Sequence, residues 1–212
     1  MLIAGAGSHA LEILDILLRN DQTSDICFFD DVSASIKSDV LNQYPIIRDQ
    51  KKLELHLREH PAFVLGTGNS VLREKLANLL TGYGGILESV ISNTALLSSL
   101  DVSLGKGLNI MHRVVIEPGV KIGEGTLINA GVLVHHESVI GKYCQVCPGS
   151  VLTGNVVIGD YCMIGSGAII LPKVHVGKNV VVAAGSVVIN NLPDNVMAAG
   201  SPAVIKKNIL SK

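Results

Sequence analysis

Residues 110–140 read IMHRVVIEPGVKIGEGTLINAGVLVHHESVI, and an aliphatic residue recurs at every sixth position of this stretch. The same step continues in both directions without a break. The aliphatic positions are Leu104, Ile110, Ile116, Ile122, Ile128, Val134, Ile140, Val146, Leu152, Ile158, Ile164, Ile170, Val176, Val182 and Val188. A fixed short period of this length indicates a stack of repeated structural units.

Each six-residue unit is predicted to form one short strand followed by a corner. Three units make one triangular coil of 18 residues, so the whole repeat makes about five coils. The aliphatic side chain points inward, a small residue two positions earlier fits beside it, and Gly or Asn accepts the backbone of the corner. Stacked coils pair their strands in parallel and bury a narrow core. The repeat therefore predicts an all-β left-handed parallel β-helix over residues 96–192.

Residues 1–90 show a different pattern, in which short strands alternate with helices. The expected strands are Leu2–Ala4, Ile26–Phe29, Ala62–Leu65 and Ile86–Ile91, and the expected helices are His9–Arg19 and Val71–Leu80. This alternation predicts a parallel α/β sheet. The region is about half of a full dinucleotide-binding fold. We therefore expect a half-Rossmann domain at 1–90, and a C-terminal tail at 193–212 after the β-helix.

The composition excludes several classes of function. The chain has 212 residues, with 17 basic and 18 acidic side chains and 48% hydrophobic residues. This balance gives no indication of a nucleic-acid partner or a polybasic membrane anchor. No run of about 18 apolar residues predicts a membrane span, and Gly5, Gly7 and His9 interrupt any signal peptide. We expect a cytoplasmic protein.

The four cysteines are expected to pack in the core. Cys144 and Cys147 form a C-x-x-C pair, which could indicate redox chemistry or zinc. However, no second C-x-x-C completes a metal site, the His56-x-x-x-His60 pair is expected on a solvated helix, and Cys144 and Cys162 fall on core positions of the repeat. We expect no metal.

A glycine motif near the N-terminus indicates a nucleotide site. Gly5-x-Gly7-x-x-Ala10 follows a strand and opens a helix, as the dinucleotide fingerprint does. The helix N-terminus favours a phosphate. Asp30 and Asp31 end the second strand, where an acid can hold a ribose or a base. A plain strand–helix turn is the alternative interpretation. Because the second half of the fold is missing, a uridine or thymidine nucleotide fits better than NAD.

Several motifs together resemble one family. The chain is similar to sugar O-acyltransferases of the sialic acid O-acetyltransferase type, and most closely to the bacterial UDP-N-acetylbacillosamine-type N-acetyltransferases with hexapeptide repeats. The resemblance covers nearly the whole chain. It rests on Gly5-Ala6-Gly7-Ser8-His9, Phe28-Phe29-Asp30-Asp31, Gly66-Thr67-Gly68-Asn69, His136-Glu137-Ser138-Val139-Ile140-Gly141, Gly154-Asn155-x-x-Ile158-Gly159 and Gly200-Ser201-Pro202-Ala203.

The resemblance implies an acetyl-CoA-dependent N-acetyltransferase. Its acceptor would be the 4-amino group of a nucleotide-linked 4-amino-4,6-dideoxy sugar, with UDP as the expected nucleotide, in the synthesis of bacterial surface glycans or glycoproteins. The resemblance implies that Gly7, Ser8 and His9 contact the nucleotide sugar, with Asp30, Asp31 and Gly68 at the nucleoside.

The same resemblance implies the residues of the reaction centre. His136 would be the general base, and Glu137 would raise its basicity. The residues implied for the acetyl-CoA channel are Gln145, Gly154, Ser166 and Ala184. Related sequences carry a second histidine where Gln145 stands, although a glutamine can still donate a hydrogen bond to a thioester or pantetheine carbonyl.

The remaining histidines have simpler interpretations. His56 and His60 are expected on a solvated helix, and His112 and His175 are isolated in the repeat. His135 competes with His136 as the base. Some enzymes of this fold are zinc carbonic anhydrases, but no second pair of histidines has the spacing to supply three imidazoles. Two other functions stay open: O-acetylation of a sugar such as a sialic acid, and a non-catalytic nucleotide-binding scaffold.

The residue before each inward aliphatic is predicted to point outward. Sorted by the 18-residue coil, these residues form three faces, of which one is entirely aliphatic. That face contains Val115, Leu133, Val151, Ile169 and Val187. A stripe of this size is too large to leave in water. It predicts packing around a threefold axis in a homotrimer, which the family resemblance also implies.

Overall fold

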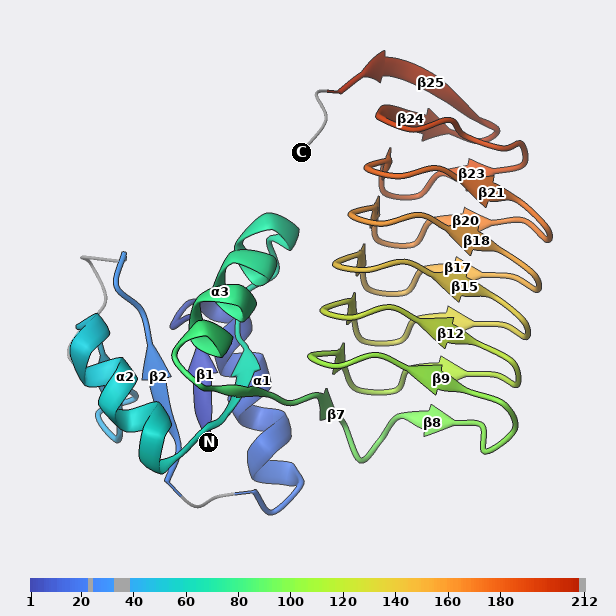
Figure 1. Ribbon diagram of the computed structural model, residues 1–212. Coiled ribbons are helices and arrows are strands. Elements are labelled where there is room, and N and C mark those ends of the chain that lie inside the picture. The colour runs from blue at the N-terminus through green and yellow to red at the C-terminus, as the bar shows by residue number, and fades with distance from the viewer. Residues whose placement is uncertain (23–24, 33–38, 210–212) are drawn as a thin grey trace.

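A computed structural model describes residues 1–22, 25–32 and 39–209. Figure 1 shows an α/β domain standing beside the lower coils of a tall β-helix, with the C-terminal strands at the far end of the stack. The left-handed parallel β-helix and the N-terminal α/β domain predicted from the sequence are confirmed. None of the described helices has the length and apolarity needed to cross a membrane.

The N-terminal domain is a six-stranded sheet in the order β3-β4-β2-β1-β5-β6. Its strands are β1 (Leu2–Ala4), β2 (Cys27–Phe29), β3 (Asp39–Val40), β4 (Tyr44–Ile47), β5 (Ala62–Leu65) and β6 (Ile86–Leu87). All pairs are parallel except β3 with β4. The chain runs from β1 to β2 on one side of the sheet and returns to β5 on the other. Such a switch point is where open α/β sheets bind ligands.

In the described part of the chain, three helices cover this sheet. They are α1 (Ser8–Arg19), α2 (Gln50–Glu59) and α3 (Ser70–Gly82). Because strand side chains alternate between faces, Ile3 and Val64 pack against α1, whereas Leu2 and Leu65 pack against α2 and α3. The face that carries α1 also meets Leu127 of the β-helix, so α1 supplies the apolar contact at the domain junction.

The β-helix consists of three parallel sheets, and each two-residue strand pairs with the strand 18 residues further along. The N-domain face contains β7 (Val90–Ile91), β10 (Asn109–Ile110), β13 (Leu127–Ile128), β16 (Gln145–Val146), β19 (Met163–Ile164) and β22 (Val181–Val182). The aliphatic face contains β8 (Leu96–Leu97), β11 (Val115–Ile116), β14 (Leu133–Val134), β17 (Val151–Leu152), β20 (Ile169–Ile170) and β23 (Val187–Val188). The third face contains β9 (Ser103–Leu104), β12 (Lys121–Ile122), β15 (Val139–Ile140), β18 (Val157–Ile158) and β21 (His175–Val176).

The inward positions of the repeat form one continuous core. Every aliphatic residue of the six-residue series is buried except Leu104, which is half-buried in the first coil. Cys144 and Cys162 are also fully buried, and their thiols donate to the carbonyl oxygens of Gly159 and Gly177 at 3.1 and 2.9 Å. These two cysteines therefore pack in the core, as their place in the repeat predicted.

The stretch Ile86–Ile91, expected to be one strand, forms two. Its first half is β6, which pairs with β5 of the N-terminal sheet, and its second half is β7, which pairs with β10 of the β-helix. The strand is interrupted here because its two halves join different sheets. At the other end, β24 (Val196–Gly200) pairs with β22, and β25 (Ala203–Asn208) pairs with β24.

A buried arginine holds α3 against the β-helix. Arg73 is fully buried and donates to the carbonyl oxygens of Gly125 at 2.7 Å, Thr67 at 3.0 Å and Gly107 at 3.2 Å. Burial lowers the pKa of Arg73 to about 9. Its neighbour Glu74 accepts a hydrogen bond from the Tyr161 hydroxyl at 2.8 Å. The two domains thus share directed hydrogen bonds as well as an apolar contact.

Candidate active site

His136 lies at the corner between the aliphatic face and the third face, two residues after β14 ends. Its Nδ1 lies 3.3 Å from Oε2 of Glu137. Because a carboxylate only accepts, Nδ1 carries the proton of the neutral ring and Nε2 keeps its lone pair. Nε2 has no hydrogen-bond partner among the described residues, and 55% of the side chain is exposed. The arrangement leaves one imidazole nitrogen free to accept a proton.

Gly154 lies one coil beyond His136 and makes room for the imidazole. A Cβ placed on Gly154 would be 2.5 Å from both Cε1 and Nε2 of His136. Contacts that short do not occur, so any side chain here would push the ring aside. The expected channel residue Gly154 therefore lies at the candidate base, with its backbone facing the free nitrogen.

Glu137 is held in place by a residue that the sequence analysis did not single out. Its backbone has a φ of +58°, and its Oε2 accepts a hydrogen bond from Asn155 at 3.0 Å. The Asn155 amide, and after it His136, lowers the pKa of Glu137. Asn155 follows Glu137 by 18 residues, so the coil period contained the signal for this pair.

Glu117 braces the same corner from the coil before. Its Oε2 accepts the backbone N–H of His136 at 3.0 Å, and its Oε1 lies 3.0 Å from Nδ1 of His135. The His135 ring is thus paired with a carboxylate through Nδ1, as the His136 ring is with Glu137, but it is less exposed, at 37% against 55%. Glu117 was missed by the sequence analysis, although it precedes His135 by one full coil.

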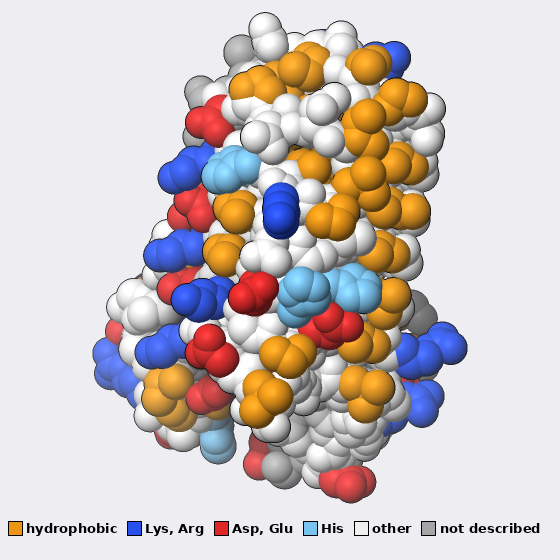
Figure 2. Space-filling view, turned by 90° about the vertical axis from the view of Figure 1, so that its right-hand side faces the viewer, with side chains coloured by type: hydrophobic (Ala, Val, Ile, Leu, Met, Phe, Trp, Pro, Cys, Tyr) orange, Lys and Arg blue, Asp and Glu red, His pale blue; other side chains and the backbone are white. Residues whose placement is uncertain are grey.

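A column of hydrophobic side chains runs along the β-helix next to the histidines at mid-height (Figure 2). The strand register confirms that the outward residues of the aliphatic face stack in one column, which contains Leu96, Val115, Leu133, Val151, Ile169 and Val187. Leu96 is 68% exposed and Ile169 is 36% exposed. In each coil this column lies next to the corner between the aliphatic face and the third face, and His136 belongs to one of these corners.

The nucleotide motifs meet at the carboxyl ends of β1, β2 and β5. Gly5 has a φ of +115°, and a Cβ on it would lie 2.9 Å from the carbonyl oxygen of Gly66, so the two glycine loops touch. A pocket of about 190 Å³ opens there. Its lining residues are Gly5, Phe29, Asp30, Asp31, Val32, Leu72 and Leu76.

The remaining nucleotide candidates surround the start of α1. Gly7 and Ser8 are exposed, and nothing lies within 4 Å of a Cβ placed on Gly7. No side chain caps the first turn of α1, so its backbone N–H groups can face an anion. His9 is different, because its ring contacts Glu12 and Asn109. Gly68 lies over the N-domain face, where a Cβ on it would be 3.5 Å from Nε2 of Gln145.

The structure does not bring the four expected acetyl-CoA residues together within one chain. Gln145 is on the N-domain face, beneath the Gly68 loop. Ser166 and Ala184 lie one above the other at the corner between the N-domain face and the aliphatic face, and both are exposed. Gly154 lies at the next corner, beside His136. These positions can face one cleft only if a second copy of the chain supplies part of it.

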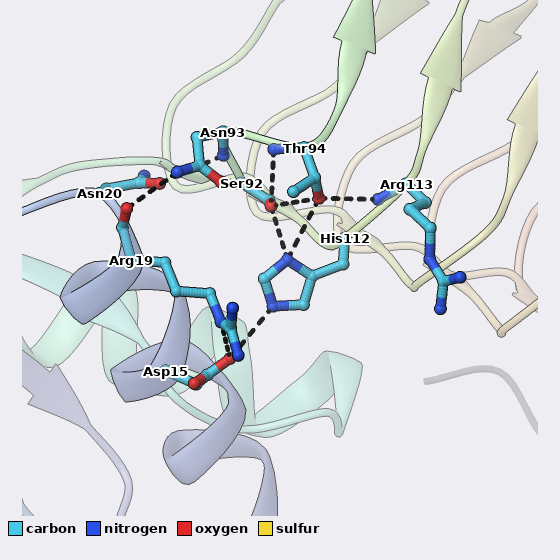
Figure 3. Close-up of polar contacts among 8 residues, drawn as sticks. All are labelled: Asp15, Arg19, Asn20, Ser92, Asn93, Thr94, His112 and Arg113. Atoms are coloured by element: carbon cyan, nitrogen blue, oxygen red, sulfur yellow. Dashed lines mark hydrogen bonds and ion pairs between the residues drawn. The ribbon is translucent and has the colours of Figure 1, made fainter.

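A larger pocket, of about 380 Å³, lies between α1 and the N-domain face. It is lined by Leu11, Glu12, Asp15, Met111, His112, Asn129, Ala130 and Pro148. Figure 3 shows how the β-helix and α1 meet beside it. His112 Nδ1 lies 2.7 Å from the Ser92 hydroxyl of the β-helix, and Nε2 lies 3.3 Å from Oδ2 of Asp15 in α1, so one ring nitrogen joins the two domains.

The positions of the remaining histidines bear on whether the chain could hold a metal ion. His56 is in α2, and His60 ends that helix. His175 is exposed on the third face. Among residues 1–22, 25–32 and 39–209, no group of three or more His, Cys, Asp or Glu side chains could hold a metal ion.

Comparison with known protein families matches both parts of the chain. Residues 1–80 match the PglD N-terminal domain. Residues 101–136, 120–154, 137–172 and 155–190 match the bacterial transferase hexapeptide, which consists of six repeats. A search of curated proteins gave no match.

Solved structures resemble the whole chain. A variant of perosamine N-acetyltransferase from Caulobacter crescentus, in complex with CoA and GDP-perosamine, is 33% identical, with a TM-score of 0.88 over 98% of this chain and 96% of that one. The acetyltransferase domain of PglB from Neisseria gonorrhoeae, in complex with acetyl coenzyme A, is 26% identical, with a TM-score of 0.88 over 96% and 97%. WeeI from Acinetobacter baumannii is 29% identical, with a TM-score of 0.81 over 96% and 98%.

Proposed function

The chain belongs to the hexapeptide-repeat sugar acetyltransferases with a PglD-type N-terminal domain, and from this premise we propose that it acetylates the 4-amino group of a nucleotide-linked 4-amino-4,6-dideoxy sugar. It is an acetyl-CoA-dependent N-acetyltransferase.

The observation that carries the proposal is the free Nε2 of His136. The sugar amine attacks the thioester carbon of acetyl-CoA, a C–N bond forms, and the C–S bond breaks. The amine loses a proton in this step, and Nε2 of His136 accepts it while Nδ1 donates to Glu137. The departing CoA thiolate then takes up a proton as the free thiol. An imidazole suits this task because its unperturbed pKa is about 6.5.

The nucleotide end of the substrate fits the N-terminal domain. The diphosphate would lie against Gly7 and Ser8, where the first turn of α1 has no side-chain cap. The nucleoside would lie in the pocket with Asp30 and Asp31, close to the Gly68 loop. This pocket has a volume of about 190 Å³ and contains two carboxylates that can accept hydrogen bonds from a ribose or a base. We propose UDP, with GDP as the alternative that the perosamine enzyme suggests.

The acetyl-CoA site is proposed to form between two copies of the chain. Within one chain, Gly154 and His136 lie at one corner, whereas Ser166 and Ala184 lie at another. Packing the aliphatic face around a threefold axis would set the first corner of one subunit against the second corner of its neighbour. Acetyl-CoA would then lie along Ser166 and Ala184 of the neighbour, which is also the subunit that supplies Gln145. It would reach His136 of the first subunit across the interface.

The assembly is tested by placing a charge on the aliphatic face. Val151→Lys buries an ammonium group in the proposed interface, so sedimentation analysis should show monomers. Val157→Lys makes the same change on the third face, where Val157 is equally half-buried, and should leave a trimer. A Val151→Lys protein that stays trimeric with unchanged stability contradicts this interface.

The reaction is tested by measuring thiol release from acetyl-CoA with several acceptors. The panel contains UDP-, dTDP- and GDP-linked 4-amino sugars and free sialic acid. The proposal expects CoA thiol to appear with a nucleotide-linked amino sugar, fastest with UDP. Release with sialic acid alone would establish O-acetylation instead, and release with none of them would overturn the proposed acceptor class.

A further inference from the structure

His9 lies in the first turn of α1, and both nitrogens of its ring are engaged within the chain. Nδ1 lies 2.8 Å from Oε2 of Glu12, and Nε2 lies 3.0 Å from Nδ2 of Asn109. The same Nδ2 donates to the carbonyl oxygen of Leu65 at 2.6 Å. Only 13% of the His9 side chain is exposed, and Asn109 is fully buried.

These contacts decide where the proton of His9 lies. A carbonyl oxygen only accepts, so the atom of Asn109 that faces Leu65 must be the amide nitrogen. That nitrogen carries two protons, and the second one points at Nε2 of His9, which therefore accepts. The ring proton therefore lies on Nδ1, which donates a hydrogen bond to Glu12. The arrangement requires a neutral imidazole with its proton on Nδ1.

A protonated ring would break this chain of contacts, because an N–H on Nε2 would face the N–H of Asn109. Two charged groups act on the ring, Glu12 from its own helix and Arg73 from α3. Burial is the main cause that lowers the pKa of His9, Arg73 lowers it further, and Glu12 opposes both. The geometry and the surroundings therefore agree on a neutral ring.

The contact joins three segments whose relative positions matter for the reaction. His9 follows the Gly5–Gly7 turn, Leu65 leads into the Gly66–Gly68 loop, and Asn109 belongs to the first coils of the β-helix. Both proposed nucleotide loops are thus tied to the β-helix at one buried point. The candidate base is also on the β-helix. The contact therefore fixes the position of the bound nucleotide sugar relative to the β-helix.

We propose that His9 is a positioning residue, which fixes the two nucleotide loops on the β-helix through Asn109 and does not bind the nucleotide sugar through its ring. The inference rests on the proposed function and revises one residue of it, since the family resemblance implied a direct contact. Nucleotide binding near His9 then relies on Gly7 and Ser8.

The tautomer is measured directly by nitrogen NMR of the full-length protein labelled at histidine. We expect His9 to show a protonated Nδ1 and a bare Nε2, and to keep this state when UDP-sugar or GDP-sugar is added to saturation. A shift of the proton to Nε2, or a large change of the His9 ring signals on saturation, would overturn the proposal. This result does not depend on whether the protein acetylates that sugar, so the two proposals fail separately.

Asn109→Asp reverses the polarity at Nε2 and provides a second readout. A carboxylate there favours the imidazolium, so the titration of His9 should move to higher pH than in the wild type. An unchanged titration would show that the two side chains are not coupled. The wild-type NMR experiment stands even if this variant folds poorly.

Kinetics separates positioning from binding. His9→Leu and Asn109→Leu both remove the contact between Nε2 and Nδ2, so each should lower kcat/KM for the nucleotide sugar at least about tenfold. The double variant should lose no more than Asn109→Leu alone, which also removes the hydrogen bond to Leu65. The KM for acetyl-CoA should not change. Asn20→Ala is the matched control, because Asn20 binds the Ile91 carbonyl at the other end of α1. It should lower stability and leave kcat/KM unchanged. Additive losses, or a loss confined to His9→Leu, would overturn the proposal.

Discussion

Two corners of the β-helix carry a histidine at the same place in the repeat, two residues after a buried aliphatic, yet only one is suited to accept a proton. His112 follows Ile110 and is 29% exposed, with both ring nitrogens engaged by Ser92 and Asp15. His136 follows Val134 and is 55% exposed, with Nε2 free above Gly154. The position in the repeat is therefore not what makes a base.

The difference comes from the residues one coil away. The coil before His112 places Thr94 next to it, and α1 covers it from outside. The coil before His136 supplies Glu117, which binds the backbone, and the coil after it supplies Gly154, which has no side chain. His136 can act as a base because the residues one coil before it and one coil after it leave its Nε2 unoccupied.

The largest expected effect separates these two histidines. His136→Asn should lower kcat by about 10²–10⁴-fold, because it removes a general base, while acetyl-CoA binding and the trimer persist. His112→Asn should keep kcat within a few-fold of the wild type. Thiol-release kinetics measure both. Equal losses in the two variants would remove the distinction between the corners.

Adding a methyl group at Gly154 tests the free nitrogen without touching the histidine. Gly154→Ala pushes the His136 ring from its place, and a displacement of about 1 Å can cost about 10²-fold in rate. The free energy of unfolding should stay nearly constant, since the exposed ring can rotate away. Pro172→Ala, one coil further along the same corner, is the control. Unchanged kcat in Gly154→Ala would show that the ring's present position is irrelevant.

The junction role of His112 predicts a loss of stability instead of activity. His112→Ala removes one hydrogen bond from the β-helix to Asp15 of α1 and one within the β-helix to Ser92, each worth about 0.5–1.5 kcal/mol. Urea unfolding should report this decrease, with kcat retained. Chemical unfolding that matches the wild type would contradict a structural role for His112.

The smallest expected effect concerns Glu137. Asn155 lowers the pKa of this carboxyl, so Asn155→Ala should raise it toward the ordinary value of about 4.3. Glu137 would then become protonated at higher pH during acidification, and the acid side of the pH–rate profile should move to higher pH. Carboxyl carbon NMR of Glu137 measures the shift, with the exposed Asn191→Ala as control. A pKa that falls or stays constant would contradict the assigned hydrogen bond.

Much of the β-helix could be predicted because its period is local. Each inward aliphatic, each corner and the register of the aliphatic face followed from counting in sixes and eighteens. Counting by one further coil would also have identified Glu117 and Asn155. The N-terminal domain was less accessible: β4 contains Pro45, and β3 has only two residues, so neither shows a clear strand pattern.

The contacts between the two domains could not be predicted from the sequence. His9 and Asn109 are 100 residues apart and belong to unrelated patterns, a helix start and a strand position of the repeat. Arg73 sits on an ordinary amphipathic helix, and its partners are backbone carbonyls at corners, which no side-chain motif indicates. Such contacts depend on how two separate folds dock, and that is visible only in three dimensions.

The central claim is that Nε2 of His136 takes the proton of the sugar amine, and chemical rescue tests it most directly. His136→Gly leaves a hole beside Gly154, and we expect its turnover to fall sharply and to rise again with the concentration of neutral imidazole added to the assay. His135→Gly should keep most of its turnover and gain nothing from imidazole. Near-wild-type turnover in His136→Gly, or an inactive His135→Gly that imidazole restores, would contradict the claim.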